Sequence, residues 1–444
     1  MYFQNRAKER AQCFFNCFSN TNTFMNWHID LPYNGAICRY NEIGTKGNNR
    51  AYFVERLCDS LRNRLAGLGK IHIELEHGRV FFTLEDGATF TPEKLAVLRQ
   101  VIPTISGVSS LSPGFLVEPT MEALETVLDE FFPAVRAACP ATPGRATTYA
   151  MRARRSDKAF PLTCEQVERH FAERLLSRFP ELEIDLKHAD LVVEVEIRHQ
   201  RAFVSFERIA GAGGLPSGTA GNVLTMLSGG FDSPVASYEM MRRGCHVDFL
   251  TFHSSPYTPP ATLEKVAELV RQLNTYQKKG CLVACNLVAA QKAIRDNCLS
   301  KHRTVLYRRM MMRIAEAVAN GLNSLAIVTG DNLGQVASQT LTNMSIISSV
   351  TQKMILRPLL TFDKLQIISV ADAIGTSIIS ARNVPDSCTV FAPDNPTTMA
   401  DLQKILEDET HLDIPALLQD CLQHTCFLNP KTFFEHPWLD RQTI

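Results

Sequence analysis

One stretch, residues 223–237, constrains what this chain can fold into more than any other feature. It reads VLTMLSGGFDSPVAS. The apolar run at its start has the length and bulk of a buried strand, and the residues from Pro234 onward predict a helix with proline in its first turn. A strand, a loop of small residues and a helix N-terminus together predict an anion-binding site, because glycines let the backbone approach the charge and free helix N–H groups point at it.

The spacing of this loop indicates which kind of phosphate site it forms. A Walker loop has the pattern GxxxxGK[ST], and no lysine follows the glycines of this chain in that way. The sequence SGGFDS instead resembles SGGxDS, the pyrophosphate loop of ATP pyrophosphatases, which cleave ATP between the α and β phosphates. An ordinary tight turn before a helix is the alternative. On the first interpretation the loop contacts ATP through Ser228, Gly229, Gly230, Asp232 and Ser233.

Composition limits the class of protein. Lys and Arg number 46 and so do Asp and Glu, so global charge gives no support for a nucleic-acid partner and local clusters must carry that argument. The 13 cysteines include no CxxC pair, which argues against a secreted disulfide framework and a zinc ribbon. Neither a membrane-length apolar run nor the apolar core of a signal peptide is found. We expect a cytoplasmic protein that does not contact a membrane.

The first half of the chain predicts two small α+β domains after an extension of unassigned role, residues 1–35. Residues 36–104 follow the order β-α-β-β-α-β, completed by an extended piece near residues 107–116, which is the ferredoxin-like pattern. Lys46 and Arg50 lie on a loop rich in Gly and Asn. They either contact RNA phosphates or belong to a solvated loop.

Residues 105–210 predict a second unit with a basic strand. Alternate strand residues share a face, so Arg152 and Arg154 project together, with Arg155 and Lys158 close by. This cluster suits the phosphate backbone of RNA, and a solvated surface is the alternative. Residues 211–221, GAGGLPSGTAG, form either a flexible linker or a structured approach to the substrate.

Residues 222–444 predict a parallel, doubly wound sheet. Apolar strands near residues 223–227, 247–253, 281–287 and 324–329 alternate with helical segments. Ligands bind beyond the carboxyl ends of such strands. The candidate site residues are therefore expected in the loops 228–233, 252–257 and 330–339 and in the loop that carries Cys388.

These segments together resemble the tRNA 4-thiouridine synthetase family, from about Cys38 to Asn395. The resemblance rests on NEIGTKGNNRAYF, RARRSDKAFP, GAGGLPSGTAG, MLSGGFDSPVA, FHSSPYT, YRRMMMRIA, VTGDNLGQVASQT, RPLLTFDK and PDSCTVFAP. It implies an α/β fold in which a doubly wound ATP pyrophosphatase domain, residues 222–444, follows a ferredoxin-like domain and a THUMP RNA-binding domain.

The resemblance also implies the chemistry. ATP adenylates O4 of the uridine at position 8 of tRNA and releases pyrophosphate. Sulfur carried as a cysteine persulfide then displaces AMP and leaves 4-thiouridine. ATP and Mg²⁺ are the implied cofactors, and tRNA and a cysteine desulfurase are the implied partners. A separate rhodanese or sulfur carrier protein, a homodimer and a role in thiamine biosynthesis are further options that the sequence leaves open.

Family positions carry over onto further residues. The expected ATP contacts outside the SGGFDS loop are Met226, Leu227, Thr251, Phe252, Arg308, Gly330 and Gln339. Asp232 would hold Mg²⁺ or shape the transition state, and a helix N-terminal cap is its alternative role. Cys388, within PDSCTVFAP, matches the cysteine that handles sulfur, and its polar surroundings favour the reactive thiolate.

One departure from the family leaves the sulfur relay open. Longer members add a rhodanese domain with a second active cysteine, and the segment after Asn395 is too short for one. The second thiol is then unassigned among Cys298, Cys421 and Cys426. Two other functions stay open from the sequence: an ATP pyrophosphatase that adenylates a small metabolite, and a non-catalytic tRNA-binding module.

Overall fold

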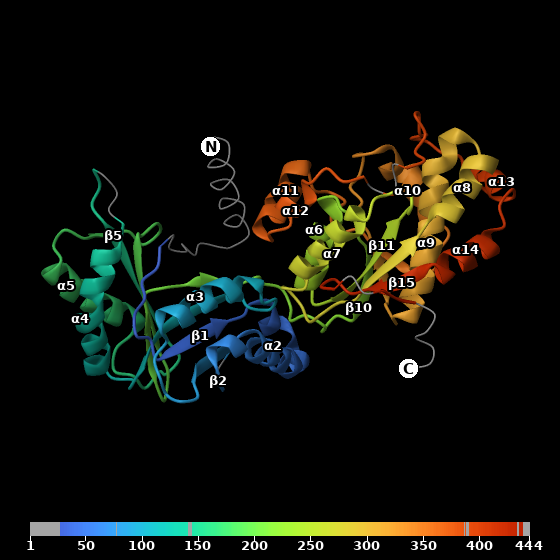
Figure 1. The fold of residues 1–444 in the computed structure, drawn as a ribbon. Coiled ribbons are helices and arrows are strands. Elements are labelled where there is room, and N and C mark those ends of the chain that lie inside the picture. The colour runs from blue at the N-terminus through green and yellow to red at the C-terminus, as the bar shows by residue number, and fades with distance from the viewer. Residues whose placement is uncertain are drawn as a thin grey trace. The chain divides into compact units, whose positions relative to one another are not determined.

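The computed structural model describes residues 27–76, 78–140, 144–385, 387, 390–432 and the backbone of 435–437. Within this part the chain divides into two compact units, which meet in sequence between Pro216 and Ser217. The helices and strands of both are drawn in Figure 1. None of the described helices is both long enough and apolar enough to cross a membrane.

The first unit begins with a ferredoxin-like fold. Its elements are β1 (Gly35–Arg39), α2 (Arg50–Arg64), β2 (Ile71–Glu76), β3 (Arg79–Leu84), α3 (Pro92–Val101) and β4 (Ser110–Val117). The strands pair antiparallel in the order β2-β3-β1-β4. Leu57 and Leu61 of α2 and Leu95 of α3 are buried in the core beneath this sheet. The β-α-β-β-α-β order predicted from the sequence is confirmed.

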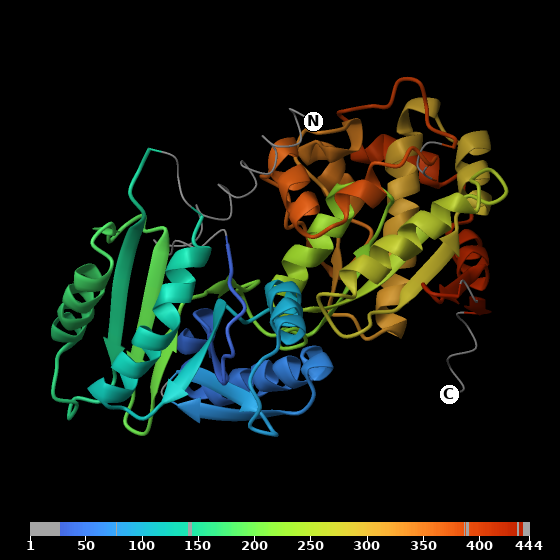
Figure 2. The ribbon, with the colours of Figure 1, turned by 60° about the vertical axis from the view of Figure 1, so that its left-hand side comes forward.

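The same sheet continues into the second half of this unit. Its elements are α4 (Met121–Ala138), β5 (Thr148–Arg155), α5 (Cys164–Arg178), β6 (Glu183–Ile184), β7 (Leu191–Ile197), β8 (Ala202–Ser205) and β9 (Ile209–Ala210). Strand β8 pairs with β4, which joins the two halves into one sheet. In Figure 2 the green strands of this half lie beside the teal and green helices. The start of the glycine-rich stretch packs against the ferredoxin-like half, since Gly213 donates its N–H to the carbonyl of Val108 at 2.7 Å.

The second unit contains the nucleotide-type sheet. Its elements as far as β13 are β10 (Asn222–Met226), α6 (Asp232–Arg242), β11 (His246–His253), α7 (Ala261–Leu273), β12 (Leu282–Asn286), α8 (Val288–Asn297), α9 (Arg303–Gly321) and β13 (Ala326–Val328). The later ones are α10 (Leu341–Ser348), β14 (Met354–Leu356), α11 (Lys364–Ala373), α12 (Ser377–Ser380), α13 (Leu402–Glu409), α14 (Ile414–Gln423), β15 (Thr425–Leu428) and β16 (Glu435–Pro437).

The strand order β14-β13-β10-β11-β12-β15-β16 places a topological switch point beside β10. From β10 the chain first builds β11 and β12 on one side, then returns to build β13 and β14 on the other, all parallel. Strand β15 is antiparallel to β12. The predicted doubly wound parallel sheet is confirmed, and the crevice outside the carboxyl ends of β10 and β13 is where such folds bind ligands.

Alternating side chains explain why helices cover both faces of this sheet. Val223 and Phe249 are buried with α6, α7 and α11, whereas their chain neighbours Leu224 and Leu250 are buried with α8, α9 and α14 on the other face. Figure 1 shows α6 and α7 on one side of β10 and β11 and α9 on the other. The two cores hold the strand ends in place, which fixes the position of the loops that follow them.

Candidate active site

The loop between β10 and α6 is closed by two serines. The backbone N–H of Ser228 donates to Oγ of Ser233 at 2.9 Å, and that hydroxyl lies 3.3 Å from the carbonyl oxygen of Ser228. The N–H of Gly230 approaches Oγ of Ser228 at 3.4 Å. Helix α6 begins at Asp232, two residues before the expected start at Pro234. As in any helix, the N–H groups of its first turn have no acceptor within the helix. The loop therefore has the geometry of an anion site.

Asp232 is the first residue of α6, and no side chain caps that helix. Its Oδ1 lies 3.1 Å from Nζ of Lys364, which begins α11. The Lys364 ammonium also lies 5.4 Å from the centre of the Phe231 ring. Sequence reasoning gave Lys364 no role, although it ends the RPLLTFDK segment. Its position beside the loop adds a positive charge where an anion would sit.

Gly330 makes room for the start of α6. A Cβ atom at this position would lie 2.7 Å from the backbone nitrogen of Ser233 and 2.9 Å from the backbone carbon of Asp232. Real side chains do not tolerate such distances to backbone atoms, so only glycine fits the end of β13 against this helix. The backbone that approaches Gly330 closely is therefore that of Asp232 and Ser233 in this chain.

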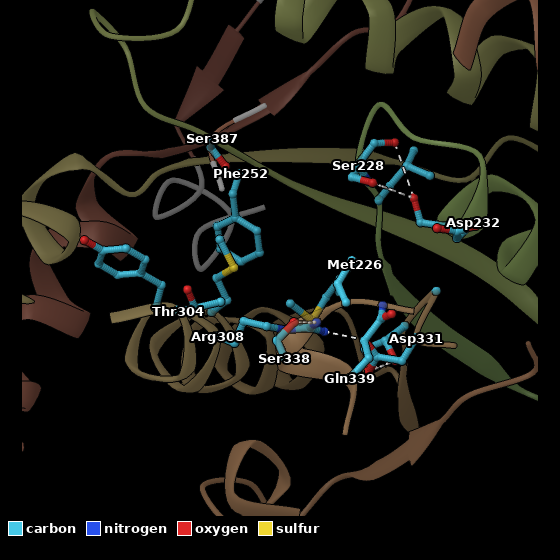
Figure 3. Close-up of a pocket in the computed structure, with 17 residues that line it drawn as sticks. Met226, Ser228, Asp232, Phe252, Thr304, Arg308, Asp331, Ser338, Gln339 and Ser387 are labelled. Carbon is cyan, nitrogen blue, oxygen red and sulfur yellow. Dashed lines mark hydrogen bonds and ion pairs between the residues drawn. The ribbon is translucent and has the colours of Figure 1, made fainter. Parts of the chain in front are cut away.

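A cavity of about 270 Å³ opens beside this loop, at the switch point of the sheet. It is lined by Met226, Leu227, Ser228, Asp232, Ser233, Phe252, Thr304, Tyr307, Arg308, Met311, Thr329, Gly330, Asp331, Val336, Ser338, Gln339 and Ser387. Figure 3 shows Ser228 and Asp232 at one part of the cavity, Ser387 and Phe252 at another, and Arg308, Ser338 and Gln339 below them. The cavity has both the polar and the apolar walls that a nucleotide needs.

Arg308 is held in the cavity wall by a buried carboxylate. Its guanidinium lies 2.5 Å from Oδ1 of Asp331, whose Oδ2 lies 3.2 Å from Nε of Arg357 and 2.8 Å from the hydroxyl of Thr329. Burial alone would raise the pKa of Asp331, but the charges of the two arginines and the bonds from Thr329 and Arg308 outweigh burial, so the pKa is lowered. Asp331 therefore stays ionised and orients both cations.

Gln339 offers the cavity an unused acceptor. Its side chain is buried, and Oε1 has no hydrogen-bond partner among the described residues. A buried amide oxygen without a partner costs free energy unless a ligand supplies a donor. The amino group of a purine base is a donor of the required kind. The unpaired Oε1 atom is therefore the feature that makes the cavity suitable for an adenine nucleotide.

The structure brings together most of the residues expected to contact ATP. Those that line the cavity are Met226, Leu227, Ser228, Asp232, Ser233, Phe252, Arg308, Gly330 and Gln339. Gly229 and Gly230 instead line a neighbouring cavity of about 180 Å³ behind the loop. Thr251 is buried in β11 and does not line the larger cavity.

Sequence reasoning missed several residues of the cavity wall. On α9 these are Thr304, Tyr307 and Met311, which share one helix face with Arg308. Helical spacing from Arg308 would have found them. Sequence reasoning did not name Thr329, Asp331, Val336, Ser338 and Ser387 individually. All but Thr329 lie in the two segments that the sequence indicated, residues 330–339 and the loop around Cys388, where local periodicity does not single out a residue.

Cys388 lies outside the described residues, but the segment leading to it is anchored next to the cavity. Ser387 lines the cavity, and Nε2 of Gln291 donates to its carbonyl at 2.8 Å. Nζ of buried Lys265 donates to the carbonyls of Ser380 and Arg382 at 3.0 and 2.7 Å.

None of the three other thiols considered from the sequence lines the cavity. Burial raises the pKa of Cys298 to about 11, with Asp408 and Glu409 adding to the effect, so its thiolate is disfavoured. Cys421 is fully buried, and Cys426 is half-buried on β15. The geometry of the described residues therefore favours none of them as the partner of Cys388.

The basic residues expected to bind RNA lie in the first unit. Arg154 and Lys158 are exposed, while the head group of Arg152 donates to the carbonyl of Leu186 at 2.5 Å. Arg155 donates to the carbonyls of Phe160 and Leu162. The ammonium of Lys46 lies 5.1 Å from the centre of the Phe53 ring. Arg50 lines an open groove between α2 and the strands β2 and β3.

The fold and this cavity define a PP-loop domain of the ATP pyrophosphatase class. Family descriptions match the whole arrangement: "ThiI ferredoxin-like domain" over residues 36–112, "THUMP domain" over 122–207 and "Thiamine biosynthesis protein (ThiI)" over 218–414. A probable tRNA sulfurtransferase of Moorella thermoacetica is 39% identical over 88% of this chain and 96% of that protein. A probable tRNA sulfurtransferase of Streptococcus mutans is 34% identical over 87% of this chain and 93% of that protein.

Among solved structures, a 4-thiouridine synthetase in complex with RNA and bound ATP superposes with a TM-score of 0.75. It is 33% identical and the match covers 88% of this chain and 98% of that one. PH1313 from Pyrococcus horikoshii, 24% identical with a TM-score of 0.59, shares the fold. The chain belongs to the tRNA sulfurtransferase (ThiI) family of enzymes.

Proposed function

We propose that this enzyme uses ATP to transfer sulfur to the uridine at position 8 of tRNA and forms 4-thiouridine. The observation that carries the proposal is the cavity itself, in which the SGGFDS loop, the Arg308 guanidinium and the orphaned amide of Gln339 surround one space. The related synthetase that was solved with RNA and ATP supports both substrates.

Each of these residues has a proposed part in binding ATP and activating the uridine. The loop from Ser228 to Ser233 and the nearby Lys364 would hold the pyrophosphate part of ATP, and Gln339 would hold the base. Arg308, oriented by Asp331, would neutralise charge on the phosphates. Oxygen O4 of uridine forms a bond to the α phosphorus as the bond to pyrophosphate breaks, which turns a poor leaving group into a good one.

Sulfur then replaces the activated oxygen. The outer sulfur of a persulfide on Cys388, delivered by a cysteine desulfurase, forms a bond to C4 of the uracil, and AMP leaves. The persulfide S–S bond must break in the same sequence. A second thiol takes over the inner sulfur as a disulfide, and an external dithiol reductant restores both thiols. A sulfur carrier protein of thiamine biosynthesis is a second acceptor that the same persulfide chemistry allows.

Mg²⁺ fits this site only together with the phosphates. The described residues contain no cluster of three metal-ligating side chains, and Asp331 is engaged by two arginines. Mg²⁺ commonly takes one carboxylate and completes its shell with phosphate oxygens and water. Asp232 would supply that carboxylate, and the ion would lower the charge on the leaving pyrophosphate.

A reconstituted reaction tests the proposal. The purified chain, unmodified tRNA, ATP with Mg²⁺, cysteine and a desulfurase should yield 4-thiouridine on nucleoside analysis. Cys388→Ala and Asp232→Ala should abolish it, and Cys164→Ala, which removes a free thiol on α5 of the first unit, serves as a matched thiol control. Full thiolation by Cys388→Ala would remove this cysteine from the mechanism. Release of pyrophosphate without tRNA would instead indicate activation of a small metabolite.

A further inference from the structure

A cluster of two aromatic and two cationic side chains lies near the cavity and has no part in the mechanism above. We name it the rim cluster: Tyr257, Phe391, Lys292 and Arg295. The rings of Tyr257 and Phe391 meet edge to face at 5.1 Å. Nζ of Lys292 lies 5.3 Å from the centre of the Tyr257 ring, and Cζ of Arg295 lies 5.1 Å from that of Phe391. A cationic group therefore lies over each ring.

Hydrogen bonds connect the rim cluster to the cavity wall. The hydroxyl of Tyr307, which lines the cavity, donates to the carbonyl of Phe391 at 3.2 Å. Helix α8 carries Lys292 and Arg295, and also Gln291, which holds the cavity residue Ser387. One hydrogen bond therefore joins the cluster to the cavity wall, and the helix that carries its two cations also holds a second cavity residue.

Exposure distinguishes the rim cluster from ordinary core packing. Tyr257 is 48% exposed, so a large part of its ring is accessible to a ligand. Arg295 is paired with Asp296 at 2.7 Å, and that pair is exposed to solvent. An exposed ring beside two cations is the combination with which proteins bind single-stranded RNA: bases stack on the ring and phosphates pair with the cations.

The proposed substrate requires such a surface. A uridine carbonyl cannot enter a cavity of about 270 Å³ while its base stays stacked, so the target nucleotide must leave the stack and its neighbours must be held outside. We infer that the rim cluster binds a nucleotide next to the target uridine, with its base on Tyr257 and its phosphate between Lys292 and Arg295. This inference rests on the proposed function.

Kinetics of the reconstituted enzyme with tRNA test the inference. Tyr257→Ala should raise the KM for tRNA about tenfold, which corresponds to the loss of roughly one stacked base, while Tyr257→Phe keeps the ring and should stay within about twofold. Lys292→Gln should reduce the dependence of tRNA affinity on salt by about one phosphate contact. Lys279→Gln is the matched charge control, because Lys279 is exposed and precedes the amino end of β12, whereas α8 with Lys292 follows the carboxyl end of that strand.

The outcomes separate this inference from the proposed function. Binding of ATP, followed by equilibrium titration without tRNA, should be the same in all four variants and the unaltered protein. An unchanged KM for tRNA in Tyr257→Ala overturns the rim cluster as an RNA site. If that variant loses rate only at limiting desulfurase, the surface binds the sulfur donor and the inference is equally wrong. The unaltered enzyme could form no 4-thiouridine while Tyr257→Ala still binds tRNA more weakly than the unaltered enzyme does. In that case the proposed reaction is wrong and the RNA site is supported.

Discussion

Replacing Lys265 with methionine probes how the sulfur-bearing segment is positioned against the anion loop. Lys265 lies on α7, is 6% exposed and donates from Nζ to the carbonyls of Ser380 and Arg382. Its stem packs against the loop, because a Cβ on Gly229 would lie 3.2 Å from its Cδ. One side chain thus contacts both the loop and the segment that leads to Cys388.

The magnitude follows from the contacts that methionine cannot make. Methionine keeps the length and the packing of the stem but removes a charged donor. Hydrogen bonds of a charged group contribute about 1.5–3 kcal/mol each, so the bonds to Ser380 and Arg382 together contribute up to about 6 kcal/mol. The adjacent cavity of about 180 Å³ admits water, which can satisfy both carbonyls. We therefore expect the free energy of unfolding to fall by about 2–3 kcal/mol.

The functional effect should be unequal between the two chemical steps. Other contacts still hold the segment, including the hydroxyl of Thr262 on the carbonyl of Pro385 at 2.9 Å. The segment should shift rather than detach, and a displacement of about 1 Å at a reacting group costs about 100-fold in rate. Sulfur transfer by Lys265→Met should fall about 10- to 100-fold, whereas pyrophosphate release that depends on tRNA should fall less than about threefold.

Two measurements on one reaction mixture check this prediction. Pyrophosphate release reports activation, and 4-thiouridine content reports sulfur transfer, with urea unfolding as the measure of stability. Lys279→Met, an exposed lysine outside the site, is the control. An equal loss of both steps would show that Lys265 acts through the anion loop or the fold, and no loss of either would refute its positioning role.

Three further predictions concern the cavity wall and the surrounding fold. Gly330→Ala should cost about 1–3 kcal/mol by overpacking and weaken ATP binding in titrations; unchanged affinity would contradict the close fit against α6. Asp331→Asn should raise the KM for ATP about tenfold and cost about 3 kcal/mol, because two arginines lose their buried counter-charge; wild-type values of both would refute it. Arg309 and Arg313 outweigh burial and lower the pKa of Glu409 from 4.5 to about 2. Its ionised form therefore stabilises the fold fully above about pH 4.5 and loses that effect as the pH falls towards 2. Glu409→Gln should cost about 3 kcal/mol at pH 7 and flatten this acid dependence in urea unfolding, and an unchanged slope would refute it.

Much of the fold was predictable because its signals are local. The SGGFDS stretch carries a strand, a loop and a helix start within consecutive residues, and the alternation of strands and helices up to β13 follows from hydrophobic spacing. The domain order and the family followed from motifs of the same kind. Element boundaries do not follow from such motifs, as α6 shows by beginning at Asp232 and not at Pro234.

The elements after β13 were not predicted, because they depend on tertiary contacts. Strand β15 is short and pairs antiparallel with β12, far away in the sequence. Helices α10 to α14 are short and irregularly spaced, so their hydrophobic faces are defined by the surfaces they cover.

Sequence alone determined that this chain has an anion loop at the end of a parallel strand and a THUMP domain before it, and it predicted a reactive-type cysteine after it. Only the tertiary structure decided what surrounds the loop: Lys364 beside Asp232, the Arg308–Asp331–Arg357 group, and the anchors of the segment before Cys388. These partners are distant in the chain, and an ion pair between distant residues produces no periodic pattern in the sequence. Packing on both faces of the sheet brings them together.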